Sequence, residues 1–190
     1  FDEDWLYKAR DLANYTIDHF FDDKTGMFFY TSDIDPELVA RKMETADNVI
    51  PGSNSVLAKV LFQLGVYFDN KDFSEKAKQM LNNVKNNVIN YGSFYSNWAT
   101  LMSWFAKQPY EIAIVGPDAN ALRAEMDEHF LPNAFFLGGK DEGTLSLLES
   151  KLQDGQTTIY VWQNKVCKLP VTDVAEALKL IEGGSIKKEY

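Results

Sequence analysis

Apolar and polar positions recur with helical spacing over the first half of the chain. Residues 4–21 carry an apolar stripe that includes Trp5 and Leu12, and residues 72–90 carry one formed by Phe73, Ala77, Met80, Leu81, Val84 and Val88. Charged or amide side chains surround both stripes, so each segment predicts a helix with one face in water. Residues 53–68 and 93–107 differ, because apolar side chains dominate them and only a narrow stripe of mostly small or neutral polar residues remains. A helix that is apolar almost all round is typical of a buried position.

The order of these segments predicts layered helices. A surface helix is followed by a hairpin of residues 27–31 and 37–42, and then by buried, surface and buried helices. A four-helix bundle gives every helix one wet face, whereas inner and outer layers produce this alternation. We therefore predict that residues 1–108 form helical hairpins of a partial (α/α) barrel or toroid. Two buried helices need more neighbours than this chain offers, so we also expect a longer protein.

The pattern changes after Pro109. Short apolar runs now alternate with turns and amphipathic stretches. They predict strands over residues 111–116, 133–137, 157–162 and 166–169, with helices over 119–130 and 172–181. The first two strands are joined by a helix, which favours a parallel pair. The predicted fold class is therefore α+β, in which a small α/β domain of residues 109–190, with a mixed sheet of about four strands, follows the helical part.

Composition and charge exclude several classes of function. A net charge of −9 and a pI near 4.7 leave no basic face for nucleic-acid phosphates. No segment approaches the ~20 apolar residues of a membrane span. Cys167 is the single cysteine, which excludes an internal disulfide and favours a small buried side chain. His19 and His129 lie far apart, so we predict no metal site; we also predict no cofactor and a cytoplasmic location.

The loop before residues 53–68 holds the candidate site. Charged and hydrogen-bonding side chains gather there at the start of a buried helix, whose free N–H groups suit hydroxyl or anionic ligand groups. The candidate ligand-binding residues are Arg41, Glu44, Asp47, Ser53, Asn54 and Ser55. The alternative interpretation is structural, with Ser53 or Ser55 capping the helix and Asp47 pairing with Arg41 or Lys42.

Other residues of the chain bear on sugar and nucleotide chemistry. Glu44 and Asp47 are a carboxylate pair of the kind that acts on sugars, although a spacing of three fixes no geometry outside a helix. Three aromatic side chains suit either sugar stacking or a helical core, and the core is favoured: Tyr95, Trp98 and Trp104. The stretch IAIVG at 112–116 precedes a helix but lacks the glycine pattern of dinucleotide binding.

Four stretches together resemble a known family: GMFFYTS (26–32), RKMETADNVIPGSNSVLAKVLFQLG (41–65), YEIAIVG (110–116) and TTIYVWQNKVCKLPVTD (157–173). In this order they resemble the C-terminal portion of thioredoxin-domain-containing proteins whose animal members are called spermatogenesis-associated. Two features depart from the family pattern. Gly52 and Ser53 stand in exchanged order relative to the usual Pro-Ser-Gly-Asn-Ser, and Trp162 replaces a frequent cysteine, so no thiol pair with Cys167 is expected.

The resemblance implies a thioredoxin-like domain, an (α/α) barrel similar to sugar epimerases and six-hairpin glycosidases, and an α/β element. Our first hypothesis is a fragment of a protein resembling carbohydrate-modifying enzymes, with a carbohydrate-like ligand and no catalytic residue or enzyme activity assigned. The alternative is a non-enzymatic interaction module that docks the thioredoxin-like domain of the longer protein or another protein. If the inner helices lack neighbours, we expect a homodimer of the fragment.

Overall fold

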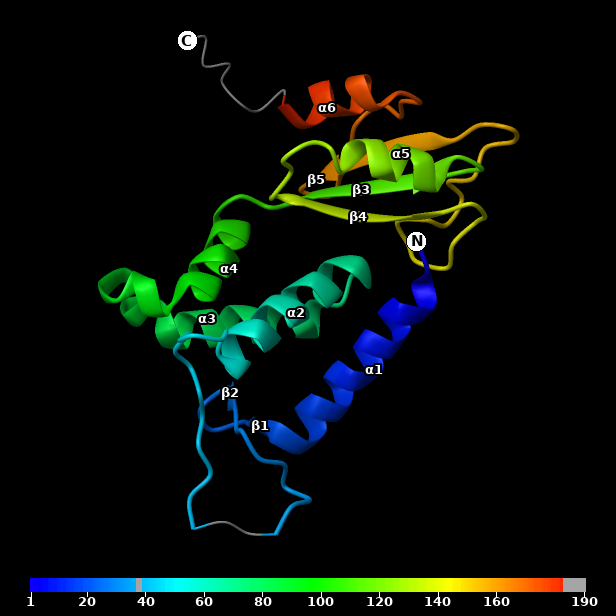
Figure 1. The fold of residues 1–190 in the computed structure, drawn as a ribbon. Coiled ribbons are helices and arrows are strands. Elements are labelled where there is room, and N and C mark those ends of the chain that lie inside the picture. Colours follow the sequence, from blue (N-terminus) through cyan, green and yellow to red (C-terminus); the bar gives the residue numbers. More distant parts are fainter. Residues whose placement is uncertain (37–38, 183–190) are drawn as a thin grey trace. The chain divides into compact units, whose positions relative to one another are not determined.

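The computed structural model describes residues 1–36 and 39–182 (Figure 1). Contacts between Cα positions divide the chain into two compact units. We call Asp4–Ala106 the helical unit, and Phe1–Glu3 together with Lys107–Tyr190 the sheet unit. The described residues form an α+β structure with six α-helices and a mixed four-stranded sheet. That residues 1–108 and 109–190 are separate domains stays a prediction.

The first elements of the helical unit are a long helix and a tight hairpin. Helix α1 covers Glu3–Phe20, and strand β1 (Phe21–Asp22) pairs antiparallel with β2 (Met27–Phe28). The predicted hairpin had placed 27–31 against 37–42 instead. Of that return arm, residues 37–38 lie outside the described residues, and 39–42 form no strand.

Helices α2 (Ser53–Tyr67), α3 (Lys71–Asn90) and α4 (Ser96–Ala106) make the core of the helical unit. A three-residue turn joins α2 and α3, which pack along each other, and α4 contacts both (Figure 1). The predicted apolar stripe of α3 is buried throughout: Phe73, Ala77, Met80, Leu81, Val84 and Val88. Its N-cap is Asn70, whose side chain accepts hydrogen bonds from the N–H groups of Asp72 and Phe73.

The predicted (α/α) barrel is wrong. The helices of the described residues are not arranged as a barrel, and α2, α3 and α4 cover one another directly. The supposed inner helix α4 has an exposed side formed by Ala99, Thr100 and Ser103, and it follows a short 3-10 turn, Gly92–Phe94. Small neutral side chains tolerate solvent as well as burial, so the lack of charge on this segment did not indicate an inner layer.

The sheet unit matches the predicted order of strands and helices. Its elements are β3 (Tyr110–Val115), α5 (Ala119–Met126), β4 (Ala134–Gly139), β5 (Thr158–Gln163), β6 (Val166–Cys167) and α6 (Val174–Glu182). The strand order is β4-β3-β5-β6, in which β3 and β4 are parallel and the other pairs antiparallel. Helices α5 and α6 cover the same sheet face, because residues of both belong to one apolar cluster with Ile112, Ile114, Ile159 and Val161 (Figure 1).

Two further predictions concern Cys167 and membranes. Cys167 is exposed and not a buried hydrophobe, because it lies on β6, the short strand at the edge of the sheet. Across the described residues, none of the helices combines the length and apolar character that crossing a bilayer requires. The cytoplasmic location stays a prediction.

Candidate functional site

Asp47 is the most buried charged residue of the candidate loop, with 4% of its surface exposed. Its Oδ1 accepts hydrogen bonds from the Gly52 N–H at 3.0 Å and from the Ser55 hydroxyl at 2.5 Å. Its Oδ2 accepts a hydrogen bond from the Asn97 N–H at 2.9 Å. Both carboxylate oxygens are therefore engaged inside the helical unit.

These hydrogen bonds join the N-termini of two helices. Gly52 is the N-cap of α2, and Asn97 lies in the first turn of α4. Helix N-termini leave N–H groups without intrahelical partners and favour negative charge, so one carboxylate serves both ends. Neither Ser53 nor Ser55 is the cap of this helix, because the N-cap residue is Gly52, which has no side chain to form a capping hydrogen bond. The role of Asn97 was missed, because its partner lies 50 positions away in the sequence.

The environment of Asp47 shifts its pKa downward. Burial acts to raise the pKa of this carboxyl, but the hydrogen bonds from Ser55, Gly52 and Asn97 together outweigh burial. The carboxylate is thus the stable form in the folded protein at neutral pH. It acts as a fixed hydrogen-bond acceptor and not as a proton donor.

The lowered pKa of Asp47 predicts a stability that depends on pH. A carboxyl with a depressed pKa in the folded state stabilises the fold above its unfolded pKa of about 3.9, and this contribution is lost as the pH falls through its folded pKa. We expect the free energy of unfolding of the wild type to fall more steeply below pH ~5 than that of Asp47→Asn. Urea titrations at several pH values measure both slopes. If the free energy of unfolding fell equally steeply with pH in both proteins, the pKa of Asp47 would not be lowered by folding. Asp22, whose pKa is lowered by Thr25, is present in both proteins and cancels.

Asn54 fixes the other side of the loop. It is fully buried, and its side-chain oxygen accepts from the N–H of Phe28 at 2.8 Å. Its amide nitrogen donates to the carbonyl oxygens of Phe28 and Glu44, both at 2.9 Å. Asn54 therefore ties α2 to β2 and to the chain at Glu44, with its amide groups satisfied internally.

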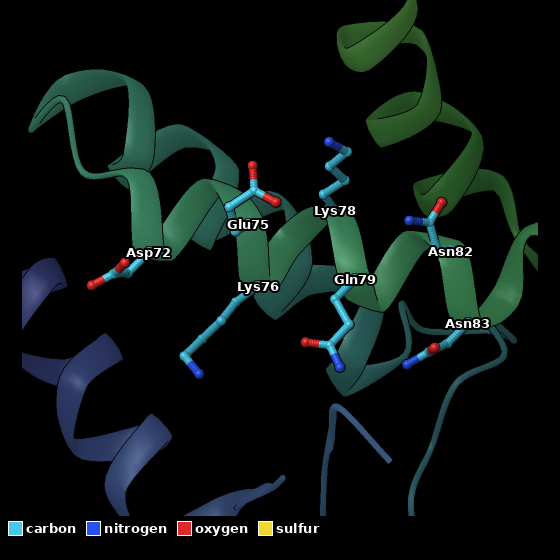
Figure 2. A pocket seen from close by; sticks show the side chains of 7 residues that line it. All are labelled: Asp72, Glu75, Lys76, Lys78, Gln79, Asn82 and Asn83. Atoms are coloured by element: carbon cyan, nitrogen blue, oxygen red, sulfur yellow. The ribbon is translucent and has the colours of Figure 1, made fainter. Parts of the chain in front are cut away.

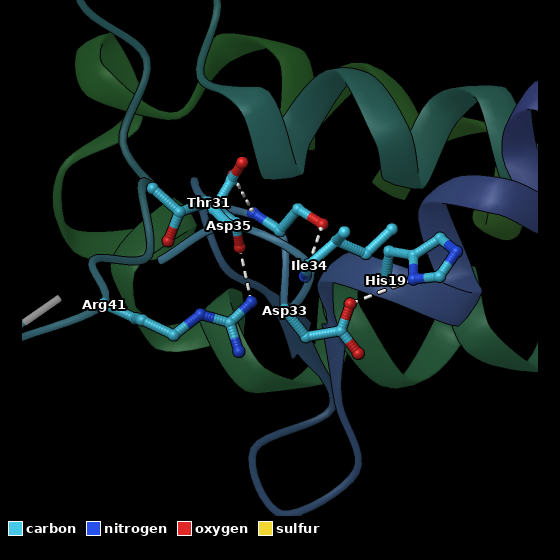
Figure 3. Close-up of polar contacts among 7 residues, drawn as sticks. His19, Thr31, Asp33, Ile34, Asp35 and Arg41 are labelled. Atoms are coloured by element: carbon cyan, nitrogen blue, oxygen red, sulfur yellow. Dashed lines mark hydrogen bonds and ion pairs between the residues drawn. The ribbon is translucent and has the colours of Figure 1, made fainter. Parts of the chain in front are cut away.

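The remaining candidates lie at the edge of this network or outside it. Figure 3 shows the Arg41 guanidinium directed at Thr31, whose carbonyl oxygen accepts its hydrogen bond, while His19 pairs with Asp33 at 2.9 Å. The Arg41 guanidinium also stacks 4.1 Å from the Phe29 ring centroid. The hydrogen bonds of Asp47 go to Gly52, Ser55 and Asn97, so the alternative pairing of Asp47 with Arg41 is not formed. The Ser53 hydroxyl is buried without a hydrogen-bond partner among the described residues. The residue Glu44 is exposed.

A hollow of about 520 Å³ lies along α3, and none of the six candidates lines it. Its lining residues are Asp72, Glu75, Lys76, Lys78, Gln79, Asn82 and Asn83 (Figure 2). These side chains project to different sides of one helix (Figure 2). Tyr95, Trp98 and Trp104 are buried, as the core interpretation predicted. Ligand binding by the six residues, with a carbohydrate-like molecule as ligand, stays a prediction.

No cluster of metal-ligating side chains is found in the described ranges. Within residues 1–36 and 39–182, no three His, Cys, Asp or Glu side chains lie close enough together to hold an ion. Zinc and other divalent sites in proteins take several such ligands. The interactions that the structure shows in the candidate loop are hydrogen bonds of Asp47, Ser55 and Asn54.

The loop of residues 45–52 presents two apolar side chains from a fixed backbone. The carbonyl oxygen of Thr45 accepts a hydrogen bond from the Trp98 indole at 2.7 Å, and the N–H of Asp47 donates to the carbonyl oxygen of Phe94 at 2.7 Å. Between these anchors and Gly52, Val49 and Ile50 are 96% and 69% exposed. The buried network thus holds an aliphatic tip in solvent.

Nearly all of this chain matches one part of a longer curated protein. The chain is similar to spermatogenesis-associated protein 20. The Mus musculus protein is 24% identical over 189 residues, which cover 93% of this chain and 24% of the relative. The Homo sapiens protein is 25% identical over the same length and coverage. No protein family model matches the chain, and no solved structure matches it.

This similarity supports the resemblance to the spermatogenesis-associated proteins but no finer statement. The chain spans about a quarter of the length of the curated relatives it matches. The similarity extends over nearly all of the chain, so both units are included in it. The epimerase-like barrel gains no support from these relatives and is contradicted by the packing of the helices.

Proposed function

We propose that the chain is a non-enzymatic interaction module that docks another protein through the tip of loop 45–52. The observation that carries this proposal is the exposure of Val49 and Ile50 on a loop whose flanks are anchored by Asp47 and Trp98. The first candidate partner is the thioredoxin-like domain that the family resemblance implies for a longer protein. The length of the relatives is compatible with further domains.

The energetics of such a tip favour binding. Burying a Val or Ile side chain in an apolar pocket contributes about 1.5–3 kcal/mol. Most loops lose conformational freedom on binding, and this loss reduces affinity. Here the hydrogen bonds of Asp47 already order the backbone, so little of that loss is left for the binding step. Two adjacent aliphatic residues on an ordered loop are therefore a suitable anchor for a pocket on a partner.

Replacing Val49 and Ile50 together by serine tests the proposal. A photoreactive amino acid at position 49, in protein expressed in cells, first identifies the partner as a covalent adduct. We then expect the double variant to bind that purified partner at least about tenfold more weakly, because the apolar contacts are lost. Calorimetric titration gives the two affinities.

Val166→Ser is the matched control, since Val166 is an aliphatic residue that is 66% exposed on β6. Its affinity for the same partner should equal that of the wild type. Equal adduct yields from photoreactive groups at positions 49 and 166, or an unchanged affinity of the double variant, would contradict docking through this loop.

A further inference from the structure

Helix α1 carries a second surface, on a different element from loop 45–52. Its packed side holds Ala13, which is buried, and Tyr7, whose ring lies 5.4 Å from that of Phe68. The opposite side is exposed although it holds large apolar residues: Trp5 is 68% exposed and Leu12 67%. The sequence prediction had placed both residues on the packed stripe. We call this exposed side the outer face of α1.

The outer face is ordered in rows with a seven-residue period. Trp5 and Leu12 form an apolar row, and Tyr15, which is 50% exposed, continues the apolar surface beside it. Positions 4, 11 and 18 form a parallel row, and each of them is an exposed aspartate. On an α-helix, positions seven apart lie on nearly the same line, about 10 Å from each other. The face therefore combines an apolar seam with an acidic flank, as the seam of a coiled coil does.

The charge of this face is negative on balance. Two basic groups reach its carboxylates and rings: Lys8, whose ammonium lies 4.4 Å from the centroid of the Trp5 ring, and Arg10, which packs over the Tyr7 ring on the packed side and donates to Asp11 at 2.8 Å. Three carboxylates thus stand against two cations. The Lys8 contact also shows that the Trp5 ring accepts a cation on its face.

We propose that the outer face of α1 binds a partner protein through a basic amphipathic helix. The apolar side of that helix covers Trp5, Leu12 and Tyr15, and its Lys or Arg side chains lie along the aspartate row and over the Trp5 ring. This charge arrangement follows the rule for helix pairs, in which opposite charges beside an apolar seam select the partner.

The same charges disfavour the other occupants. In an antiparallel pair of two copies, the aspartate rows would face each other, and like charges beside a seam are repulsive. A bilayer with anionic lipids repels carboxylates, and helices that lie on such membranes carry Lys and Arg on their polar face. A basic helix satisfies both the apolar seam and the acidic row.

Two designed 21-residue helical peptides test this proposal. They share one leucine seam and differ only at the flanking positions, which are all lysine in one and all glutamate in the other. Fluorescence anisotropy with the 190-residue chain gives both affinities, and the emission of Trp5, the exposed tryptophan, reports the site. At low salt we expect the lysine peptide to bind about tenfold more tightly than the glutamate peptide, and half-molar salt should remove most of this difference.

Variants of α1 locate the effect. Asp11→Asn with Asp18→Asn should remove most of the preference for lysine, whereas Asp23→Asn with Glu75→Gln, which removes the same charge from exposed positions elsewhere, should leave it unchanged. Leu12→Ser should weaken the binding of both peptides. Circular dichroism confirms that each variant is folded.

The opposite results overturn the proposal. Equal affinities for the two peptides at low salt would exclude charge selection, and affinities that Leu12→Ser leaves unchanged would exclude this face. Absence of binding by both peptides would exclude a helical partner. Concentration-dependent dimers in sedimentation that Leu12→Ser dissociates would assign the face to a second copy, and binding of the chain to neutral phosphatidylcholine vesicles that Leu12→Ser abolishes would assign it to a membrane.

Discussion

Replacing Trp98 by alanine is expected to lower the free energy of unfolding of the helical unit by about 4 kcal/mol. The side chain is fully buried, and its indole N–H donates to the carbonyl oxygen of Thr45 at 2.7 Å. Alanine leaves a large cavity between helices and removes the donor that anchors loop 45–52. Urea denaturation followed by far-UV circular dichroism measures the loss.

Two matched variants separate the contributions. Trp98→Phe keeps an aromatic ring but lacks the N–H donor, so we expect an intermediate loss of about 2 kcal/mol. Trp5→Ala makes the same substitution as Trp98→Ala at an exposed position of α1 and should change stability by less than about 0.5 kcal/mol. Similar losses for Trp98→Ala and Trp5→Ala would show that Trp98 is not a core residue.

The sequence predicted α3 well because its two faces differ strongly in chemistry. Every residue of its predicted stripe, from Phe73 to Val88, is buried. Charged and amide side chains around this stripe leave a single orientation in which the helix can pack. In the sheet unit, apolar runs bounded by turns predicted β3, β4 and β5 for a similar reason.

Two helices show where periodicity was insufficient. On α4, Ala99, Thr100 and Ser103 carry no charge but face solvent, and their neutrality was interpreted as burial. On α1, apolar residues cover a wide arc, and the prediction placed Trp5 and Leu12 on its packed stripe. The structure buries Ala13 and exposes Trp5 and Leu12. Layered helices were predicted from residues 53–68 and 93–107, which were interpreted as inner helices, and the exposed side of α4 contradicts that interpretation.

The candidate loop was located from the sequence, but its chemistry was not. Asp47, Asn54 and Ser55 gather at the start of α2, as polar residues before a buried helix suggest. Their partners, among them the N–H of Asn97 and the backbone of Phe28, come from distant parts of the chain. Sequence patterns report local spacing and do not contain such pairings. The exposure of Val49 and Ile50 likewise depends on where the loop is anchored.

Replacing Asp47 by alanine is expected to lower the free energy of unfolding by about 3 kcal/mol and to abolish docking through loop 45–52. The substitution leaves the N–H groups of Gly52 and Asn97 without their acceptor, and each buried donor that loses its partner costs about 1–3 kcal/mol, partly offset by water. Urea denaturation measures the stability. Hydrogen exchange at Gly52 and Asn97 should accelerate, because these two amides lose their protection.

Asp47→Asn and Asp23→Ala complete this experiment. Asparagine keeps one acceptor oxygen, so we expect Asp47→Asn to retain part of the stability. Hydrogen exchange should stay slow at one of the two amides and accelerate at the other. Asp23 is exposed in the β1–β2 turn, and its replacement removes a carboxylate without touching the network. The decisive measurement is binding of the identified partner at a temperature where Asp47→Ala is folded. If Asp47→Ala binds the partner as tightly as the wild type, docking does not require the order that Asp47 gives the loop. If binding is lost while both aliphatic residues remain, the buried carboxylate acts on docking through the conformation of the loop.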